Sequence, residues 1–369
     1  MRRAAALLLF LSIASACGGG ATPVGSPGPS EAPTPSATVA ARSLPTPAPT
    51  PSPSPAPVYW PLTGVRAEDP AMVKRRPLNV RLPNDPAARP QVGLAKADIV
   101  FEMIVEGGIT RYSAIYHSQD STSVGPVRSY RFSDLHITQM LRGALVASGA
   151  TIEEKDAVTR SVAAGNMLSV DAQRVGGPYF RVSGRPAPND LFTNLLTARQ
   201  AVNEAGGAAP VDVPPLAFFP TVDHDPLAGG FGSSVPASTV RIPFQRDPVT
   251  FTWDESAKGY RRTQAGARTV DPDGNVQIDA RNVVVMHTDI WQTSVVEDVL
   301  GSLGLDYRMT GTGKASIFRD GRRVDGSWKR EGVLDMFSFH DAAGERILLS
   351  PGQSWVHFAY PAWIVTHEP

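Results

Sequence analysis

Apolar residues recur along the chain in short runs, and their spacing predicts the order of strands and helices. Residues 98–117 contain two runs rich in β-branched and aromatic side chains, interrupted by Gly107 and Gly108. This pattern predicts a β-hairpin, because glycines between two strand-like runs favour a tight turn. Further short apolar runs predict strands over residues 78–84 and 144–150.

Helical spacing marks two segments in the first half of the chain. In residues 134–142 the apolar side chains recur every three or four positions, which predicts a helix. Residues 189–207 repeat this spacing, with Asn189 placed to cap the first turn and Gly206 placed to end the helix. The first half is therefore expected to mix helices with strands.

Strand-like patterns dominate the second half. Alternating residues over 248–262 predict a hairpin, and the apolar run over 280–288 predicts a buried strand. Residues 314–330 alternate on both sides of Asp320-Gly321, a dipeptide typical of two-residue hairpin turns. Residues 336–360 predict two further turns and three strands. We expect an α+β fold, with a mixed N-terminal subdomain followed by a β-rich C-terminal subdomain.

Composition divides the chain into five parts. Residues 1–17 have the character of a targeting signal, and residues 18–57 are rich in Pro, Ser, Thr and Ala. Residues 206–240 are rich in Gly, Pro and Ala with little periodicity, which indicates a connecting segment. The remaining segments, 58–205 and 241–369, are expected to form an N-terminal α+β domain and a C-terminal β-rich domain.

The first seventeen residues have the order of a secretory signal. Arg2 and Arg3 precede an apolar run over residues 4–13, and small residues lead into Cys17. The apolar run, about ten residues long, is too short for a bilayer core that needs roughly 20. Small residues ending in cysteine resemble the bacterial lipobox. This resemblance implies diacylation of the Cys17 sulfur and cleavage just before it.

The cysteine count favours the same interpretation. Cys17 is the single cysteine of the 369-residue sequence, so no internal disulfide can form. The alternative is an ordinary secretory signal, which would leave an unused thiol near the mature N-terminus. We therefore expect a protein held on the extracytoplasmic face of the cell membrane, with the membrane contacted through an N-terminal lipid.

Residues 18–57 are expected to form a disordered tether. Their composition cannot bury enough apolar surface to offset the entropy of the chain. The proline-rich part favours polyproline II, which extends about 3.1 Å per residue, so the tether could reach on the order of 100 Å. A tether of this length would hold a folded body well clear of the membrane.

The charge balance limits the classes of partner. Lysine plus arginine and aspartate plus glutamate both total 35, which gives a formal net charge of zero. A chain without a basic excess has no general electrostatic attraction for nucleic acid, so no nucleic-acid partner is expected.

Most catalytic and metal-binding signatures do not fit this sequence. It has no G-x-S-x-G, S-x-x-K or H-E-x-x-H motif, and the Gly-Lys pair in residues 311–316 lacks the earlier glycine of a phosphate loop. Residues 271–275 resemble the start of a calcium loop, but the glycine is misplaced, so a hairpin turn is expected there. The histidines occur singly; His224, between two aspartates, is a weak metal candidate. We expect no metal and no cofactor.

Charged residues next to Gly and Pro turns concentrate between residues 79 and 134. Glycine allows backbone N–H groups to approach a ligand, and arginine offers a planar fork for carboxylate or phosphate. The alternative is that these charges form structural ion pairs at the ends of the sheet. The candidate ligand-binding residues are Asn79, Arg89, Glu102, Glu106, Arg111, Arg128 and Arg131.

The same region resembles a known family. RPQVGLAKADIVFEMIVEGGITRYSAIYH (89–117) and VGPVRSYRFSDL (124–135) are similar to the N-terminal domain of YerB-like bacterial lipoproteins, a family of unknown function. GSWKR (326–330) and DAAGERILLSPGQSWVHF (341–358) resemble the C-terminal domain of that family. The resemblance covers nearly all of residues 60–360. It implies an extracytoplasmic lipoprotein with two α+β domains and carries no established activity, substrate or cofactor.

Two positions depart from the family pattern. Asn189 stands where the resemblance leads us to expect histidine, and Ser148-Gly149-Ala150 stands where a Gly-x-Ser turn is expected. A site that depended on that imidazole or that hydroxyl would be altered in this chain.

Two classes of function follow from these features. The favoured one is a non-catalytic binding or scaffold module for an anionic cell-envelope component, such as a cell-wall polymer, or for an envelope protein. The alternative is an envelope hydrolase or transferase with Glu102 and Glu106 as acid and base. Residues four apart on one strand lie roughly 13 Å apart. The carboxylates of an inverting glycosidase lie about 6.5–9.5 Å apart, so the spacing disfavours an enzyme.

Overall fold

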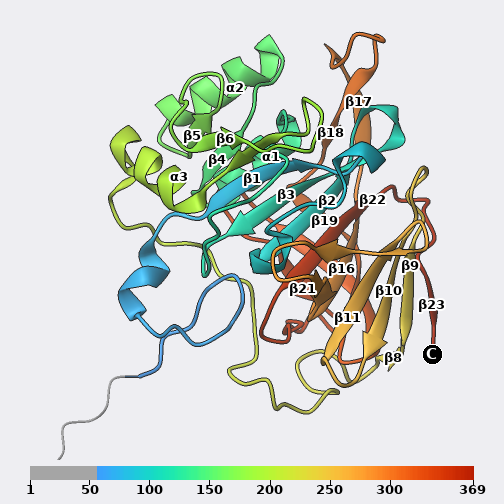
Figure 1. Cartoon of the computed structure of the whole chain (residues 1–369). Coiled ribbons are helices and arrows are strands. Elements are labelled where there is room, and N and C mark those ends of the chain that lie inside the picture. The colour runs from blue at the N-terminus through green and yellow to red at the C-terminus, as the bar shows by residue number, and fades with distance from the viewer. Residues whose placement is uncertain (1–55) are drawn as a thin grey trace, which may run out of the picture. The chain divides into compact units, whose positions relative to one another are not determined.

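One long β-sheet runs through both halves of the chain in a computed structural model that describes residues 56–369 (Figure 1). Its main path has the order β21-β20-β19-β16-β22-β2-β3-β1-β4-β5, and β8 pairs with β20. The strands of this large sheet are β1 (Leu78–Pro83), β2 (Ile99–Ile104), β3 (Thr110–Tyr116), β4 (Ala144–Ala147), β5 (Leu168–Asp171), β8 (Val235–Pro236), β16 (Asn282–His287), β19 (Gly311–Arg319), β20 (Arg322–Arg330), β21 (Ser338–His340) and β22 (Ser354–Ala359).

The strand β22, from near the C-terminus, lies in the middle of this sheet. It runs parallel to β2 on one side and parallel to β16 on the other. All six of its residues are buried, as expected for a strand covered on both faces. Strands from residues 58–205 and from residues 241–369 are thus hydrogen-bonded within one sheet.

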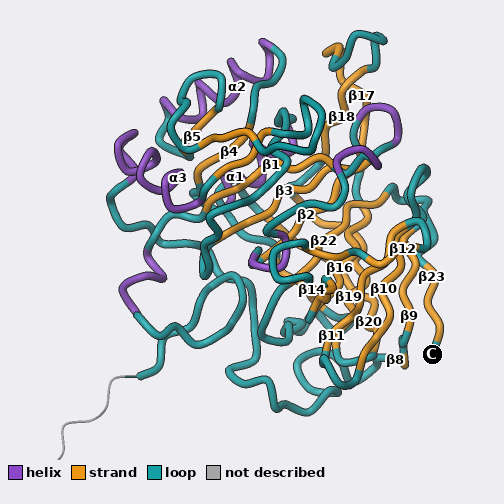
Figure 2. Tube along the Cα trace, viewed as in Figure 1, coloured by secondary structure: helices purple, strands orange, loops and turns teal. Residues whose placement is uncertain are grey.

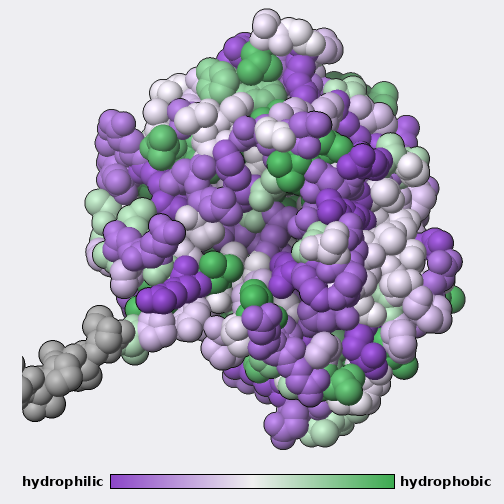
Figure 3. All heavy atoms as spheres, turned by 60° about the horizontal axis from the view of Figure 1, so that its bottom comes forward, coloured by the Kyte–Doolittle hydropathy of each residue, from purple (hydrophilic) through white to green (hydrophobic). Residues whose placement is uncertain are grey.

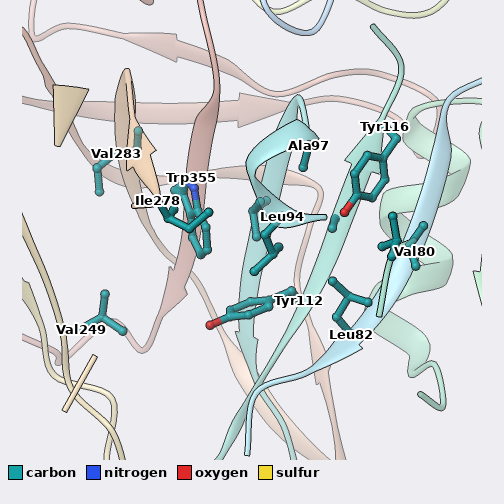
Figure 4. Packing of buried hydrophobic residues seen from close by; sticks show 14 of the residues in the cluster. Val80, Leu82, Leu94, Ala97, Tyr112, Tyr116, Val249, Ile278, Val283 and Trp355 are labelled. Carbon is teal, nitrogen blue, oxygen red and sulfur yellow. The ribbon is translucent and has the colours of Figure 1, made fainter. Parts of the chain in front are cut away.

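A second sheet packs against one face of the large sheet. Its order is β12-β11-β10-β9-β23, and β15 pairs with β11. Side chains of both sheets share one apolar core, in which Tyr112 and Trp355 of the large sheet lie near Val249 of the second sheet (Figure 4). The strands of the second sheet are β9 (Thr239–Ile242), β10 (Val249–Asp254), β11 (Gly259–Gln264), β12 (Ala267–Arg268), β15 (Asp279–Ala280) and β23 (Thr366–Glu368).

The opposite face of the large sheet builds a second core. Along β2, Val100 points into the first core, whereas Ile99 and Phe101 point into the second, which follows the two-residue period of a strand. Helix α1 covers part of this face through Ile137 and Met140. Figure 2 shows that the helices gather near the β1, β4 and β5 end, while strands fill the rest of the molecule.

The helices and the small sheets complete the fold. Figure 1 shows the hairpin β17–β18 projecting beyond the large sheet. The face turned forward in Figure 3 is mostly hydrophilic, with hydrophobic residues in small separate groups. The remaining elements are α1 (Phe132–Met140), α2 (Ile152–Ala163) and α3 (Leu195–Val202), the short helical turns η1 (Pro70–Lys74), η2 (Pro86–Ala88), η3 (Leu94–Lys96), η4 (Glu106–Gly108) and η5 (Asn203–Gly207), and the two-stranded sheets β6 (Tyr179–Arg181) with β7 (Leu191–Thr193), β13 (Val270–Asp271) with β14 (Val276–Gln277), and β17 (Ile290–Val296) with β18 (Leu303–Tyr307).

Most local predictions are confirmed, and so is the α+β class. The hairpin expected over 98–117 is β2–β3, and the one expected over 314–330 is β19–β20. Asp320 and Gly321 both have positive φ, the conformation that a tight two-residue hairpin turn requires. The calcium-like segment 271–275 forms the hairpin turn between β13 and β14.

The helix predicted over 189–207 is too long at its start. Helix α3 begins at Leu195, and Asn194 rather than Asn189 caps it, accepting a hydrogen bond from the Leu196 N–H at 2.9 Å. The preceding residues form β7, because they pair antiparallel with β6, and Thr193 also exchanges two backbone hydrogen bonds with Val124. This long-range pairing outweighs the helical spacing of the segment.

One further prediction needs correction, and one helix was not predicted at all. Residues 336–360 contain the strands β21 and β22 and isolated bridges, rather than three full strands. Helix α2 was not predicted, although Thr151 and Glu154 form a capping box at its start. Most of its residues are polar or charged, so its apolar periodicity is weak.

The predicted signal and tether lie almost entirely outside the described residues. Cys17 and residues 18–55 therefore remain predictions. Among the helices of residues 56–369, none is long and apolar enough to cross a membrane.

Candidate functional site

The structure separates the candidate residues into several places. Glu106, Arg111 and Arg131 meet in one cluster at the end of the β2–β3 hairpin. Glu102 lies in the core between the two sheets. Asn79 donates a hydrogen bond to the Thr138 hydroxyl at 2.9 Å and is fully buried.

Glu102 is the carboxylate of a fully buried ion pair. The Arg262 guanidinium on β11 donates to both of its oxygens, at 2.9 and 3.1 Å, and neither side chain is exposed. Thr110 and Asn84 donate further hydrogen bonds to Glu102, at 2.8 and 3.1 Å. The Arg262 guanidinium also lies 4.7 Å from the ring centre of Trp355. Glu102 therefore links the large sheet to the second sheet.

Glu106 occupies the tight turn between β2 and β3. Gly107 and Gly108 both have positive φ there, which favours glycine at these two positions. The Arg111 guanidinium donates to Glu106 at 2.8 Å, and Arg131 donates to the same carboxylate through two nitrogens. Burial alone would raise the pKa of Glu106, but the charges and hydrogen bonds of Arg111 and Arg131 outweigh it and lower the pKa to about 2.

A second buried ion pair lies beside this cluster. Arg81 on β1 contacts the Asp134 carboxylate at 3.2 Å, and both side chains are fully buried. Asp134 also accepts a hydrogen bond from the Arg131 N–H at 2.7 Å, which caps the start of α1. The charges of Arg81 and Glu106 are thus held within one low-dielectric region.

Two further carboxyl groups, those of Glu297 and Glu154, lie beside Arg131 at the edge of the cluster. Glu297, just after β17, lies 3.1 Å from the Arg131 Nε, and its side chain is almost fully buried. Burial raises the pKa of Glu297 to about 8, and the neighbouring charge of Glu154 on α2 adds to the shift against the opposing effect of Arg131. Burial also raises the pKa of Glu154. The β17–β18 hairpin is thereby packed against α2 at a carboxyl pair.

This cluster has the chemistry of a structural centre. Glu106, Arg111 and Arg131 are each at most 8% exposed, so their charges are paired with one another and largely shielded from solvent. Glu106 stays ionised at neutral pH because its pKa is low, so it is not suited to protonate a leaving group. Glu102 lies in a different cluster and is sealed from solvent. The geometry gives no support to an acid and base pair made of Glu102 and Glu106.

The two other arginines are less enclosed. Arg89 forms an ion pair with Asp247 and donates to the Asn84 carbonyl at 2.6 Å. Arg128 is half-buried, and its Nη1 donates to Asn189 at 3.3 Å. Asn189 thus occupies a polar contact at the position where the family resemblance leads us to expect histidine.

An open pocket lies at η1, away from the residues predicted from the sequence. Unlike the buried cluster, it is lined by cations that lack a full set of carboxylate partners. Its volume is about 330 Å³. Four basic side chains line it, and we call it the basic pocket: Lys74, Arg75, Arg76 and Arg199. Met72 and Pro210 supply exposed apolar lining, and the buried Leu78 and Val202 lie beneath it.

The basic pocket has more cations than anions. Arg75 and Arg199 share a single carboxylate, Asp120, at 2.8 and 2.7 Å. Lys74 pairs with Asp212, but both side chains are more than half exposed, so water and salt screen that pair. Arg76 donates to a backbone carbonyl, and its Nε has no hydrogen-bond partner among the described residues. An anion entering the pocket would relieve this imbalance.

The burial of these cations strengthens the case. Burial lowers the pKa of Arg76 and of Arg199, and the charge of Arg75 lowers the pKa of Arg199 further, against the attraction of Asp120. Each guanidinium remains charged at neutral pH. The lowered pKa values therefore indicate that these cations are held partly away from water, and Arg199 close to another cation, which is unfavourable. The run Lys74-Arg75-Arg76 was the sequence signal for this pocket, but Arg199 is distant in sequence.

No group of potential metal ligands occurs among residues 56–369. His224, the weak metal candidate, contacts Asp320 at 3.0 Å and stacks on Phe219 with ring centres 3.9 Å apart. Its neighbours Asp223 and Asp225 do not join it in a ligand set.

Comparisons with known proteins place both halves of the chain. Residues 62–208 match the N-terminal domain, and residues 240–356 the C-terminal domain, of a protein of unknown function (DUF3048). The chain is 28% identical over 297 residues to YerB of Bacillus subtilis (strain 168), whose name designates it a candidate lipoprotein; the match covers 80% of this chain and 85% of YerB. The crystal structure of YerB from Bacillus subtilis superposes with a TM-score of 0.70 at 24% identity, covering 84% of this chain and 99% of YerB.

Proposed function

We propose that this chain, a member of the DUF3048 family, is a lipid-anchored extracytoplasmic protein that binds an anionic component of the cell envelope. The function of the family is unknown, and the open basic pocket supports the proposed binding. The alternative partner is an envelope protein that presents an acidic group. In either case the ligand is a carboxylate or a phosphate.

The charge imbalance of the basic pocket carries this proposal. Four cations line the pocket, whereas their carboxylate partners are Asp120 and the solvent-exposed Asp212. Arginine presents a planar fork of donors that matches the oxygens of carboxylate and phosphate. The exposed apolar side chains of Met72 and Pro210 in the pocket lining would suit a short carbon chain attached to the anion.

The proposed location rests on the N-terminal sequence and on the relative. Cys17 follows small residues and a short apolar run, and YerB carries the name of a candidate lipoprotein. The proline-rich residues 18–57 would carry the folded body outward from the membrane. A binding domain on such a tether would reach ligands within the envelope.

Removal of two pocket cations tests the binding function. We expect the double variant Lys74→Ala with Arg76→Ala to bind purified cell-wall fragments at least about tenfold more weakly, which corresponds to about 1.4 kcal/mol. Both side chains end at the pocket, and neither belongs to a buried ion pair with a carboxylate. Isothermal titration calorimetry on the whole folded body would measure the dissociation constant.

The matched control removes two cations at another place. Lys314→Ala with Lys329→Ala changes the net charge equally, on exposed positions of β19 and β20. This control should bind as the wild type does. Equal binding by the pocket variant and the wild type would refute the anionic site.

A further inference from the structure

A second pocket, of acidic character, adjoins the basic pocket. Its volume is about 550 Å³. We call it the acidic pocket, and its lining includes Trp60, Arg66, Glu68, Asp69, Met72 and Asp98. Met72 of η1 lines both pockets.

The two pockets also meet at a stacked pair of side chains. The Arg75 guanidinium, which lines the basic pocket, lies 5.4 Å from the ring centre of Trp60, which lines the acidic pocket. Arg75 and Met72 together form the partition, so one ligand of moderate size could extend into both pockets. Such a ligand would meet cations on one side and carboxylates on the other.

Asp98 gives the acidic pocket an unused acceptor. Its side chain is buried, with only 1% of the residue exposed, and one oxygen accepts the backbone N–H groups of His117 and Ser118. The other oxygen, Oδ1, has no hydrogen-bond partner among the described residues. A buried carboxylate oxygen without a donor is unfavourable, so a donor supplied by a ligand would be stabilising.

The other charges of the acidic pocket favour a cationic donor. Glu68 and Asp69 line the same pocket, and Arg66 is its single cation. Burial raises the pKa of Asp98, and the hydrogen bonds of Ser118 and His117 and the charge of Arg75 offset this effect only in part, so a further cation would stabilise the ionised carboxylate. A protonated amine carries both the donor and the positive charge.

We propose that the acidic pocket binds a protonated primary amine, so that the natural ligand carries an anionic group for the basic pocket and an amine for Asp98. This inference rests on the proposed function of the basic pocket and narrows its ligand to a zwitterionic molecule, such as a peptide with carboxylate and amine side chains. A purely anionic polymer would fill the basic pocket alone.

A pair of defined dipeptides tests the amine site. N-acetyl-Glu-Lys carries carboxylates and one free amine, and its Nε-acetylated form keeps the carboxylates and lacks the amine charge. We expect the wild type to bind the free amine form about tenfold more tightly, as measured by calorimetry, because a charge-assisted hydrogen bond is lost on acetylation. Asp98→Asn should abolish this preference while leaving the affinity for the acetylated form unchanged.

A second variant protects the test against misfolding. Asp98→Asn removes a buried charge, so its fold would be checked by thermal unfolding, whereas Glu68→Gln alters an exposed side chain of the same pocket. Glu68→Gln should reduce the preference for the free amine about two- to threefold, and Glu331→Gln, exposed elsewhere, should not change it.

The possible results separate the two proposals. Equal affinity of the wild type for both dipeptides overturns the amine site and leaves the basic pocket standing. Failure of both dipeptides to bind, or binding that Lys74→Ala with Arg76→Ala leaves unchanged, overturns the proposed function and the amine site together. A preference that survives both Asp98→Asn and Glu68→Gln assigns the amine to another place and also overturns the inference.

Discussion

Glu102 and Arg262 place two full charges in the core between the sheets. Each charge is buried completely, and the Glu102 carboxylate receives donors from Arg262, Thr110 and Asn84. Transfer of a charge from water into a protein core costs several kcal/mol unless a partner compensates it. The burial of each charge is therefore tolerated only because the other charge compensates it.

Loss of one partner should cost far more than loss of both. We expect Glu102→Gln to lower the free energy of unfolding by about 3–5 kcal/mol, because Arg262 would remain buried and charged without a carboxylate. The double variant Glu102→Gln with Arg262→Met should recover much of that loss, since no unpaired charge is left. Urea denaturation followed by circular dichroism would measure both.

An exposed ion pair provides the control for this experiment. Arg241 and Glu368 form a pair in which both side chains are about half exposed, at 48% and 56%. Glu368→Gln should change the free energy of unfolding by less than about 1 kcal/mol. If Glu102→Gln costs no more than this control, the ion pair is not the structural link that its geometry indicates.

At the scale of elements, the β17–β18 hairpin is joined to the body through a carboxyl group that favours its proton. Glu297 follows β17 and lies against Arg131 and Glu154. Its folded pKa of about 8 lies above its ordinary value because burial disfavours the charged form. The folded state therefore binds this proton more tightly than the unfolded state does.

The sign of the resulting pH dependence follows from proton linkage. Where the folded state holds more protons, the free energy of unfolding falls as the pH rises. One pKa unit corresponds to about 1.4 kcal/mol, so between about pH 5 and about pH 8 we expect wild-type stability to fall by more than about 1 kcal/mol relative to Glu297→Gln. Guanidinium denaturation at several pH values would show the difference.

Glu331→Gln removes an exposed carboxyl group and should show the same dependence of stability on pH as the wild type. Parallel curves for the wild type and Glu297→Gln would show that Glu297 is ionised in the folded protein as in the unfolded one. The pH range separates this effect from that of Glu106, whose low pKa makes its contribution to stability decline only as the pH falls from about 4.5 toward 2.

The elements that the sequence predicted well are those set by neighbours in the chain. The hairpins β2–β3 and β19–β20 follow from alternating runs around glycine turns, which need no distant partner. The predicted start of α3 was wrong because residues 191–193 pair with β6 and because Thr193 also pairs with Val124, far away in sequence. The place of β22 between β2 and β16 is equally non-local. The apolar pattern predicts a buried strand but not the strands with which it pairs.

Across the whole molecule, the site was harder to predict than the fold. The sequence predicted Glu106, Arg111 and Arg131 as candidate ligand-binding residues, but charge pattern alone does not reveal that these three groups pair with one another in a buried cluster. The basic pocket depends on the approach of Arg199 on α3 to Lys74 at the end of η1, and only tertiary packing brings them together. Composition could not show that local excess, because the total charge of the chain is balanced.

The proposed anchor belongs to the whole chain, because it would set where the folded body works. The apolar run before Cys17, about ten residues, is too short to hold the protein in a bilayer that needs roughly 20. Two or more acyl chains would anchor it durably, whereas one would hold it only marginally. If Cys17 is the attachment point, membrane association depends on its sulfur.

Replacement of Cys17 tests this directly. We expect Cys17→Ser to lose incorporation of radiolabelled palmitate and to move from the membrane fraction into the medium. The thermal unfolding of the body should stay unchanged, because the cysteine lies some forty residues before the first described residue. Ser26→Ala, in the proposed tether, should remain labelled and membrane-bound. A Cys17→Ser protein that stays in the membrane fraction would contradict the lipid anchor, since nothing else in the proposal ties the body to the bilayer.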